Sequence, residues 1–260
     1  MDDGTALARL WAEHPAGHFI LRRLPDYPAD TPPYAVWLPH DAPTRVRRPV
    51  ILALHGSGER GRDGRRQTRV GLGPVLPDLS PPCAALVVFP QAAPDEDWHG
   101  AAAQRAWMAL EATIAEFGGD PQCVALTGLS LGGTGAWLMA LAAPQRFVRL
   151  AVICGRLEPQ QLSADLQAAA EPYRAAAERL RDLPVRVFHG AEDPVVPVLN
   201  ARRMVSALGA VGADVRYTEY PAGNHGAWVQ AYREPGLVAW LSGWSPPAAG
   251  VVAIGGCGTR

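Results

Sequence analysis

The sequence predicts an α/β domain with a mostly parallel central sheet and helices on both faces. Apolar runs of strand length alternate along the chain with segments in which apolar residues recur at helical spacing. The run Val50–Leu54 is continuously apolar, as expected of a strand that is covered on both faces. A second apolar run, at residues 124–126, leads through a glycine-containing turn into a helical segment. Such alternation is typical of α/β folds with a parallel sheet.

Length and composition indicate one large globular domain. The chain has 260 residues, of which 48% are hydrophobic, and this is enough for a full hydrophobic core. We expect a single domain over residues 1–244, followed by a flexible Pro-, Ala- and Gly-rich tail at 245–260. A net charge of -1 argues against a nucleic-acid partner, and no apolar run approaches the roughly 20 residues of a membrane span.

The N-terminus and the cysteines bear on the cellular compartment. The first four residues are acidic and lack the basic and apolar regions of a signal peptide, so a cytoplasmic location is expected. The four cysteines form no C-x-x-C pair. Three of them, Cys83, Cys123 and Cys154, lie in or beside apolar strand-like runs and are expected to be buried thiols, while Cys257 lies in the tail.

The elements before the serine-containing turn follow from apolar pattern and from prolines and glycines. A short helix is expected at residues 5–13, and strands at 18–24 and 34–38 are joined by a proline-rich loop. Buried strands are expected at 47–54 and 84–89. An amphipathic helix that ends at the following glycines is indicated by the spacing of Ala103, Trp107, Leu110, Ile114 and Phe117.

The stretch Gly128-Leu-Ser130-Leu-Gly132 fits the pattern G-x-S-x-G between an expected strand and an expected helix at residues 134–143. This context is that of a nucleophile elbow, in which a sharp turn lifts the serine hydroxyl clear of the sheet. The glycines fit because a side chain would collide with the neighbouring strand or helix. The backbone N–H of Leu131 could then stabilise a developing oxyanion. The alternative is a chance match in a sequence with 27 glycines.

A glycine-rich loop, His55-Gly-Ser-Gly-Glu-Arg-Gly61, follows the buried strand at residues 47–54. It matches neither the P-loop nor the dinucleotide-binding glycine pattern. We therefore favour a role as the second oxyanion donor, through the backbone N–H of Gly56 or Ser57. A plain glycine turn is the alternative.

The second half of the chain continues the alternation, with one interruption. Strands are expected at 149–153, 184–188 and 214–220, and helices at 198–208 and, for the most part, 227–241. Residues 155–183 suggest helix in two pieces, broken at Pro172. This insertion would either cap the active site or pack at the side of the domain.

A catalytic serine needs a base, usually a histidine that a carboxylate orients. In hydrolases with this elbow the chain order is serine, acid, histidine. Only His189 and His225 follow Ser130, and His189 directly ends a strand, so we expect His225 to be the base. The acid is expected in the loop after residues 184–188, where Asp193 lies with Glu192 as its close rival. All three residues then follow the carboxyl ends of parallel strands, where such sheets place ligands.

Several motifs together resemble α/β-hydrolases of the predicted-peptidase and phospholipase/carboxylesterase-like kind, and the chain is similar to feruloyl-esterase-type carbohydrate esterases. The motifs are Leu54-His-Gly-Ser-Gly-Glu-Arg-Gly61, Phe89-Pro-Gln91, the elbow at residues 126–133, Ile153-Cys-Gly155, Phe188-His-Gly-Ala-Glu-Asp-Pro-Val-Val-Pro197 and Val215-Arg-Tyr-Thr-Glu-Tyr-Pro221. The resemblance covers about residues 47–241. It implies an α/β-hydrolase fold, a triad of Ser130, Asp193 and His225, and a site lined by Glu59, Gln91 and Trp98.

The leading functional hypothesis is a serine hydrolase of the carboxylesterase kind, which cleaves esters through an acyl-enzyme. A peptidase with the same triad is the second hypothesis, and a non-catalytic hydrolase-like binding protein the third. No metal or organic cofactor is expected. The expected partner is a small-molecule ester, with no nucleic acid and no membrane, and the oligomeric state stays open, a homodimer included.

Overall fold

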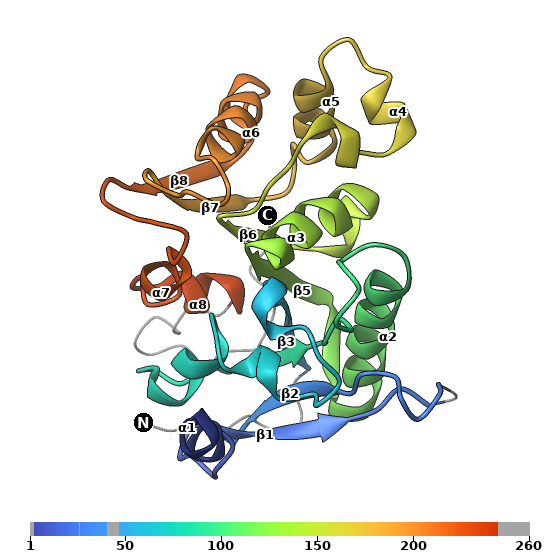
Figure 1. The fold of residues 1–260 in the computed structure, drawn as a ribbon, viewed down its shortest axis with the longest axis vertical. Helices are drawn as coiled ribbons and strands as arrows, with labels where there is room; N and C mark the ends of the chain where they lie inside the picture. Colours follow the sequence, from blue (N-terminus) through green and yellow to red (C-terminus); the bar gives the residue numbers. More distant parts are fainter. Residues whose placement is uncertain (1–2, 26, 41–46, 244–260) are drawn as a thin grey trace.

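The central feature of the fold is one eight-stranded sheet with the order β1-β2-β4-β3-β5-β6-β7-β8 (Figure 1). The computed structural model describes residues 3–25, 27–40 and 47–243. The first two strands pair antiparallel, as do β2 and β4, and all other pairs are parallel, which confirms the expected mostly parallel sheet. The strands are β1 (Gly17–Arg22), β2 (Tyr34–Pro39), β3 (Arg48–Leu54), β4 (Leu86–Phe89), β5 (Gly119–Leu129), β6 (Arg149–Ile153), β7 (Val185–Gly190) and β8 (Val215–Tyr220).

Helices cover both faces of the sheet (Figure 1). They are α1 (Asp3–Leu10), α2 (Gly100–Phe117), α3 (Leu131–Ala142), α4 (Ala164–Gln167), α5 (Pro172–Arg179), α6 (Leu199–Ala210), α7 (Trp228–Ala231) and α8 (Leu237–Leu241). One core lies under α2, α3, α4, α5 and α6, and a second lies under α7 and α8, with α1 packed against it. Successive side chains of a strand point to opposite faces, so Val50, Leu52 and Leu54 enter the first core and Ile51 and Ala53 the second. This two-sided burial explains the continuous apolar run.

The segment at residues 227–241, expected to be helical for the most part, holds two short helices, α7 and α8. Pro235 and Gly236 lie between the two helices, and Gly236 has a φ of 82°, a left-handed conformation that favours glycine. A proline has no N–H to donate to the preceding turn, so one continuous helix is excluded at this position.

The insertion at residues 155–183 lies beside α3 and α6. Its leucines belong to the core, since Leu157 and Leu180 are fully buried and Leu162 and Leu166 nearly so. Pro172 is at the first turn of α5, where its missing N–H costs nothing. Ala176 and Ala177 of α5 are fully buried as well. This burial favours side packing over a mobile cap.

Truncation of Leu180 is expected to destabilise the fold strongly. Leu180→Ala removes a fully buried side chain at the C-terminal end of α5, and such changes reduce the free energy of unfolding by about 2–5 kcal/mol. The matched control is Leu199→Ala on α6, because Leu199 is 47% exposed. Urea denaturation of both variants measures the difference. If both variants lost equally little free energy of unfolding, the insertion would be only loosely packed against the domain.

Three other expectations concern cysteines, membrane spans and the tail. Cys83, Cys123 and Cys154 are buried thiols, as expected. Among the described residues, no helix combines the length and apolar character that crossing a membrane requires. Cys257 and the tail at 245–260 lie outside the described residues. The cytoplasmic location and the homodimer stay predictions.

Candidate active site

The turn between β5 and α3 holds Ser130 in an unusual backbone conformation, with φ 52° and ψ -118°. A Cβ atom at Gly128 would lie 2.1 Å from the carbonyl oxygen of Gly132, and one at Gly132 would lie 2.1 Å from that of Leu54. The turn therefore closes only with glycine at both positions. A positive φ at a non-glycine residue costs on the order of 1–3 kcal/mol, and such strain is concentrated at functional sites. The expected elbow is present.

The structure brings Ser130, His225 and Asp193 into one hydrogen-bonded chain. The Oγ atom of Ser130 is 2.8 Å from Nε2 of His225, and Nδ1 of His225 is 2.7 Å from Oδ2 of Asp193. The parallel pairing of β7 with β8, with Gly190 opposite Tyr220, brings the loops that carry Asp193 and His225 together. The side chain of Asp193 is fully buried, whereas that of His225 is 18% exposed. His225 therefore lies between a buried carboxylate and a partly buried serine.

Asp193 is held as a carboxylate by donors on both of its oxygens. Oδ1 accepts the backbone N–H groups of Val195 and Val196 at 2.8 and 2.9 Å, and Oδ2 accepts from His225. Burial acts to raise the pKa of Asp193, but these hydrogen bonds outweigh it and hold the pKa below its ordinary value. The rival acid, Glu192, is exposed. The charge that faces His225 is therefore that of Asp193.

His189 contacts the same carboxylate, which the sequence reasoning missed. Its Nε2 atom is 2.9 Å from the carbonyl oxygen of Val196 and 3.2 Å from Oδ2 of Asp193. Because a carbonyl oxygen can only accept, Nε2 carries a proton. Burial lowers the pKa of His189 and favours its neutral form. The only sequence signal was its position four residues before Asp193.

Two further residues fix the loop that carries His225. The thiol of Cys154 donates to the carbonyl oxygen of His225 at 3.4 Å, and burial raises the pKa of Cys154 to about 12, so the thiol keeps its proton. The ring of Trp228 packs edge-on against His225 with centroids 5.4 Å apart. Cys154, Asp193 and His225 lie close enough to hold a metal ion, but their own hydrogen bonds already occupy them.

The glycine-rich loop lies beside the serine because β3 pairs with β5, with Leu54 opposite Gly128. A Cβ atom at Gly56 would lie 2.9 Å from Cδ1 of Leu129 and 3.5 Å from Cβ of Ser130. Ser57 follows at the start of a short 3-10 helix and is exposed. Gly56, one of the two expected oxyanion donors of this loop, thus lies next to Ser130, as does Leu131, the first residue of α3.

The glycine-rich loop is attached to the next loop by His55. Its Nδ1 donates to the carbonyl oxygen of Gly56 at 2.6 Å, and its Nε2 accepts the backbone N–H of Ala92 at 3.0 Å. The indole N–H of Trp98 donates to the carbonyl oxygen of His55. Only the neutral imidazole can make both side-chain bonds, and burial lowers the pKa of His55 to about 4.

Mild acid is expected to destabilise the protein through His55. A pKa lowered from about 6.5 to about 4 gives stability that is complete above pH 6.5 and declines as the pH falls towards 4. Between pH 7 and pH 5 the loss in unfolding free energy is about 2 kcal/mol. Urea titrations at both values should show a smaller loss in His55→Gln than in wild type.

His99→Gln is the control for this experiment, because His99 is an exposed histidine. Its urea titrations at the same two pH values show how much the loss of an exposed histidine changes the measurement. An undiminished loss in His55→Gln would show that His55 does not control acid sensitivity.

Of the residues that the resemblance placed along the site, Gln91 and Trp98 need a correction. Both are buried, and their polar groups bond to the chain itself: Gln91 to Gly64 and Glu59, and Trp98 to His55. Their hydrogen bonds hold the surrounding loops in place, and their burial leaves almost none of either side chain exposed to contact a substrate. Glu59 is only partly buried, and its Oε2 would lie 3.2 Å from a Cβ at Gly56, so it stays beside the serine. Burial raises the pKa of Glu59.

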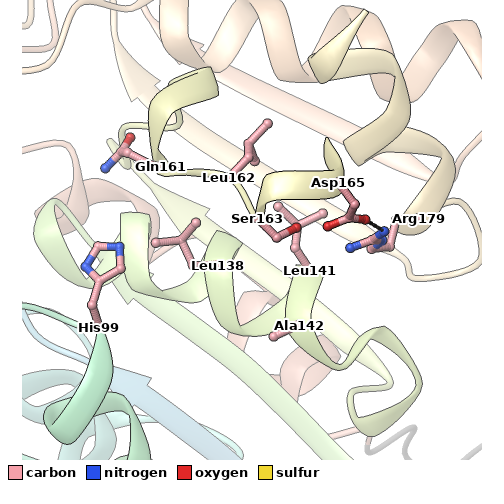
Figure 2. A pocket seen from close by; sticks show the side chains of 9 residues that line it. All are labelled: His99, Leu138, Leu141, Ala142, Gln161, Leu162, Ser163, Asp165 and Arg179. Carbon is pink, nitrogen blue, oxygen red and sulfur yellow. Dashed lines mark hydrogen bonds and ion pairs between the residues drawn. The ribbon is translucent and has the colours of Figure 1, made fainter. Parts of the chain in front are cut away.

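A pocket of about 370 Å³ lies between α3 and the insertion (Figure 2). Its α3 residues are Leu138, Leu141 and Ala142, at the far end of the helix from Ser130. An ion pair between Asp165 and Arg179 lies at its edge. Because it contains neither Ser130, Asp193 nor His225, this pocket is separate from the hydrogen-bonded chain.

Comparisons with known proteins agree with the geometry. The family described as "Putative esterase" matches residues 29–206. The chain is 32% identical to "Acyl-protein thioesterase 1" of Gibberella zeae over 127 residues, which cover 49% of this chain and 50% of that protein. It is 27% identical to "Esterase LipQ" of Mycobacterium tuberculosis over an alignment of 234 residues, which covers 73% of this chain and 53% of that protein. The chain thus spans about half the length of these curated relatives.

Among solved structures, the fold is similar to that of a thermostable esterase. The TM-score is 0.72 at 27% identity, over 87% of this chain and 62% of that one. The structural likeness confirms the α/β-hydrolase fold, and with the family match it confirms the resemblance that the motifs indicated.

Proposed function

The chain belongs to the putative esterase family, and we propose that it is a serine hydrolase that cleaves carboxylic esters through an acyl-enzyme. The observation that carries the proposal is the hydrogen-bonded chain from Ser130 through His225 to Asp193, with distances of 2.8 and 2.7 Å. These lengths are what proton transfer from a serine to a histidine requires. The strained elbow supports the same conclusion, because it presents the hydroxyl at the carboxyl edge of the sheet.

In the proposed reaction, Ser130 Oγ attacks the ester carbonyl carbon while its proton moves to Nε2 of His225. Asp193 stabilises the imidazolium and holds the tautomer with the proton on Nδ1. The negative charge on the carbonyl oxygen is stabilised by the backbone N–H of Leu131 and by that of Gly56 or Ser57. His225 then protonates the departing alcohol. Water, activated by the same histidine, releases the acid and regenerates Ser130. This chemistry needs no metal or organic cofactor.

Two measurements test the proposal. A fluorophosphonate probe is expected to label Ser130, since the probe reports an activated serine and would leave a non-catalytic binding protein unlabelled. Hydrolysis of p-nitrophenyl esters is then compared with cleavage of peptide amides. Faster turnover of the esters supports the esterase, whereas a preference for amides would favour the peptidase. Absence of both labelling and turnover would contradict a serine hydrolase of either kind.

A further inference from the structure

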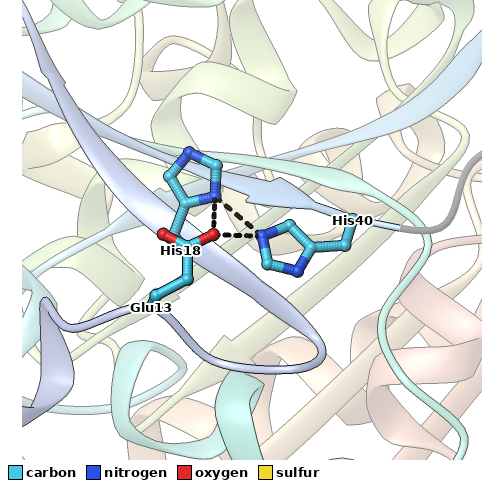
Figure 3. A group of neighbouring side chains, drawn as sticks. All are labelled: Glu13, His18 and His40. Atoms are coloured by element: carbon cyan, nitrogen blue, oxygen red, sulfur yellow. Dashed lines mark hydrogen bonds and ion pairs between the residues drawn. The ribbon is translucent and has the colours of Figure 1, made fainter.

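The side chains of Glu13, His18 and His40 converge on one another (Figure 3), beside the edge strand β1 of the sheet. His40 Nε2 is 2.6 Å from Oε1 of Glu13, and His18 Nδ1 is 3.5 Å from the same oxygen. The two ring nitrogens are 3.1 Å apart. Two imidazole nitrogens and one carboxylate oxygen therefore point at a common position.

The fold produces this convergence from three separate segments. In the antiparallel pair of β1 and β2, His18 lies opposite Leu38, and His40 follows two residues later on the same face. The backbone N–H of His40 donates to the carbonyl oxygen of Ala16, which continues the pairing beyond the end of β2. Glu13 lies between α1 and β1. Their spacing along the chain matches no helical or turn pattern, so it is the strand pairing that brings them together.

Without a cation, hydrogen bonds cannot pair all three of these close atoms with one another at the same time. If both facing nitrogens carry protons, two N–H groups oppose each other at 3.1 Å. If only one does, the lone pair of the other nitrogen faces the carboxylate oxygen. A single cation at the common position accepts lone pairs from all three atoms and removes both conflicts.

We propose that Glu13, His18 and His40 bind a divalent transition-metal ion, with Zn²⁺ as the best fit. Imidazole ligands favour Zn²⁺, Ni²⁺ and Cu²⁺ over Mg²⁺ and Ca²⁺. Zinc bonds of about 2.0–2.2 Å in tetrahedral geometry put neighbouring ligand atoms about 3.3 Å apart. The observed separations of 2.6, 3.1 and 3.5 Å bracket that value. The Glu13 side chain is 71% exposed and can make the small adjustment, and water completes the coordination.

The bound ion ties the segment after α1 to the hairpin of β1 and β2. Glu13, His18 and His40 come together only in the folded chain, so the metal stabilises the native state by mass action. The strand β1 is at the edge of the sheet, separated from β5 and its serine by β2, β4 and β3. The site is therefore structural, and the rate of ester hydrolysis does not depend on it.

Zinc binding by the full-length protein tests the proposal. Isothermal titration with Zn²⁺ is expected to give one site in the wild type, and Co²⁺ at the same site should give the visible absorption of a tetrahedral complex. His18→Ala and His40→Ala are each expected to weaken binding by at least about 100-fold, since loss of a residue that merely orients a ligand already costs about 10–100-fold. Glu13→Gln is the milder variant, because Glu13 is exposed and its loss leaves the hairpin intact.

The matched control is His99→Ala. His99 is also exposed and 2.7 Å from a carboxylate oxygen, that of Asp97, but no third ligand joins them among the residues that the structure describes. It should bind Zn²⁺ like the wild type. A rise in Tm with Zn²⁺ in the control that is lost in Glu13→Gln supports the site. Unchanged titration curves in Glu13→Gln and both histidine variants, or no uptake by the wild type, would overturn it.

Discussion

Ser130→Ala is expected to lower kcat for ester hydrolysis by about 10³-fold or more and to abolish labelling by a fluorophosphonate. The reason is that serine, histidine and aspartate act as one unit, so loss of the nucleophile removes nearly all of their joint contribution. The Nε2 atom of His225 faces the hydroxyl of Ser130, so Ser130 is the side chain whose proton it can remove. What rate remains comes from substrate binding and the oxyanion donors.

The fold should survive this substitution. Alanine has the same preference against a positive φ as serine, so the strain at 52° is neither relieved nor increased. Circular dichroism and the urea midpoint should therefore stay close to those of the wild type. Ser206→Ala, an exposed serine on α6, is the control and should retain full activity. Activity of Ser130→Ala within tenfold of wild type would move the nucleophile elsewhere, with Ser57 as the first suspect.

The arrangement of these residues followed from the sequence because chain order and strand ends constrain it tightly. Parallel strands all end at one edge, so a serine after β5, an acid after β7 and a histidine after β8 must meet there. Glycine at 128 and 132 marked the elbow because only glycine fits its close contacts. Such predictions depend on local backbone geometry, which the sequence specifies directly.

Other features depend on which way a side chain turns within a loop, and sequence pattern does not give that. Gln91 was expected to face the substrate. In the structure its amide oxygen accepts the backbone N–H of Gly64, and its NH₂ group donates to the carbonyl oxygen of Glu59, both in a neighbouring loop. His189 was not chosen as the base because it directly ends a strand. In the structure this position buries the ring and places it against Asp193. The convergence of Glu13, His18 and His40 is a further example. It depends on the pairing register of β1 and β2, which the sequence alone does not specify.

Asp193→Asn is the second change expected to have a very large effect, a loss of about 10⁴-fold in kcat. The backbone decides how the new amide is oriented. Oδ1 of Asp193 accepts the N–H groups of Val195 and Val196, and only an oxygen can accept both. The amide oxygen of the variant therefore takes the Oδ1 position, and its NH₂ group takes the place of Oδ2.

That NH₂ group then faces Nδ1 of His225, which has to accept instead of donate. The single proton of the neutral ring moves to Nε2 and points at the hydroxyl of Ser130. A nitrogen that already carries a proton cannot accept one from the serine, so the base is lost although its position is kept. His189 adds to the effect, because its Nε2–H meets a donor where it met an acceptor.

The control is Glu192→Gln, which removes the same charge one residue away. Glu192 is exposed, so this variant should hydrolyse esters at close to the wild-type rate. If Glu192→Gln lost activity as severely as Asp193→Asn, the acid would have been wrongly assigned between the two neighbours. If Asp193→Asn kept most of its kcat, a carboxylate would not be needed to set the tautomer of His225. The backbone donors of Val195 and Val196 make that second result unexpected, because they leave the amide no orientation in which it can accept from the histidine.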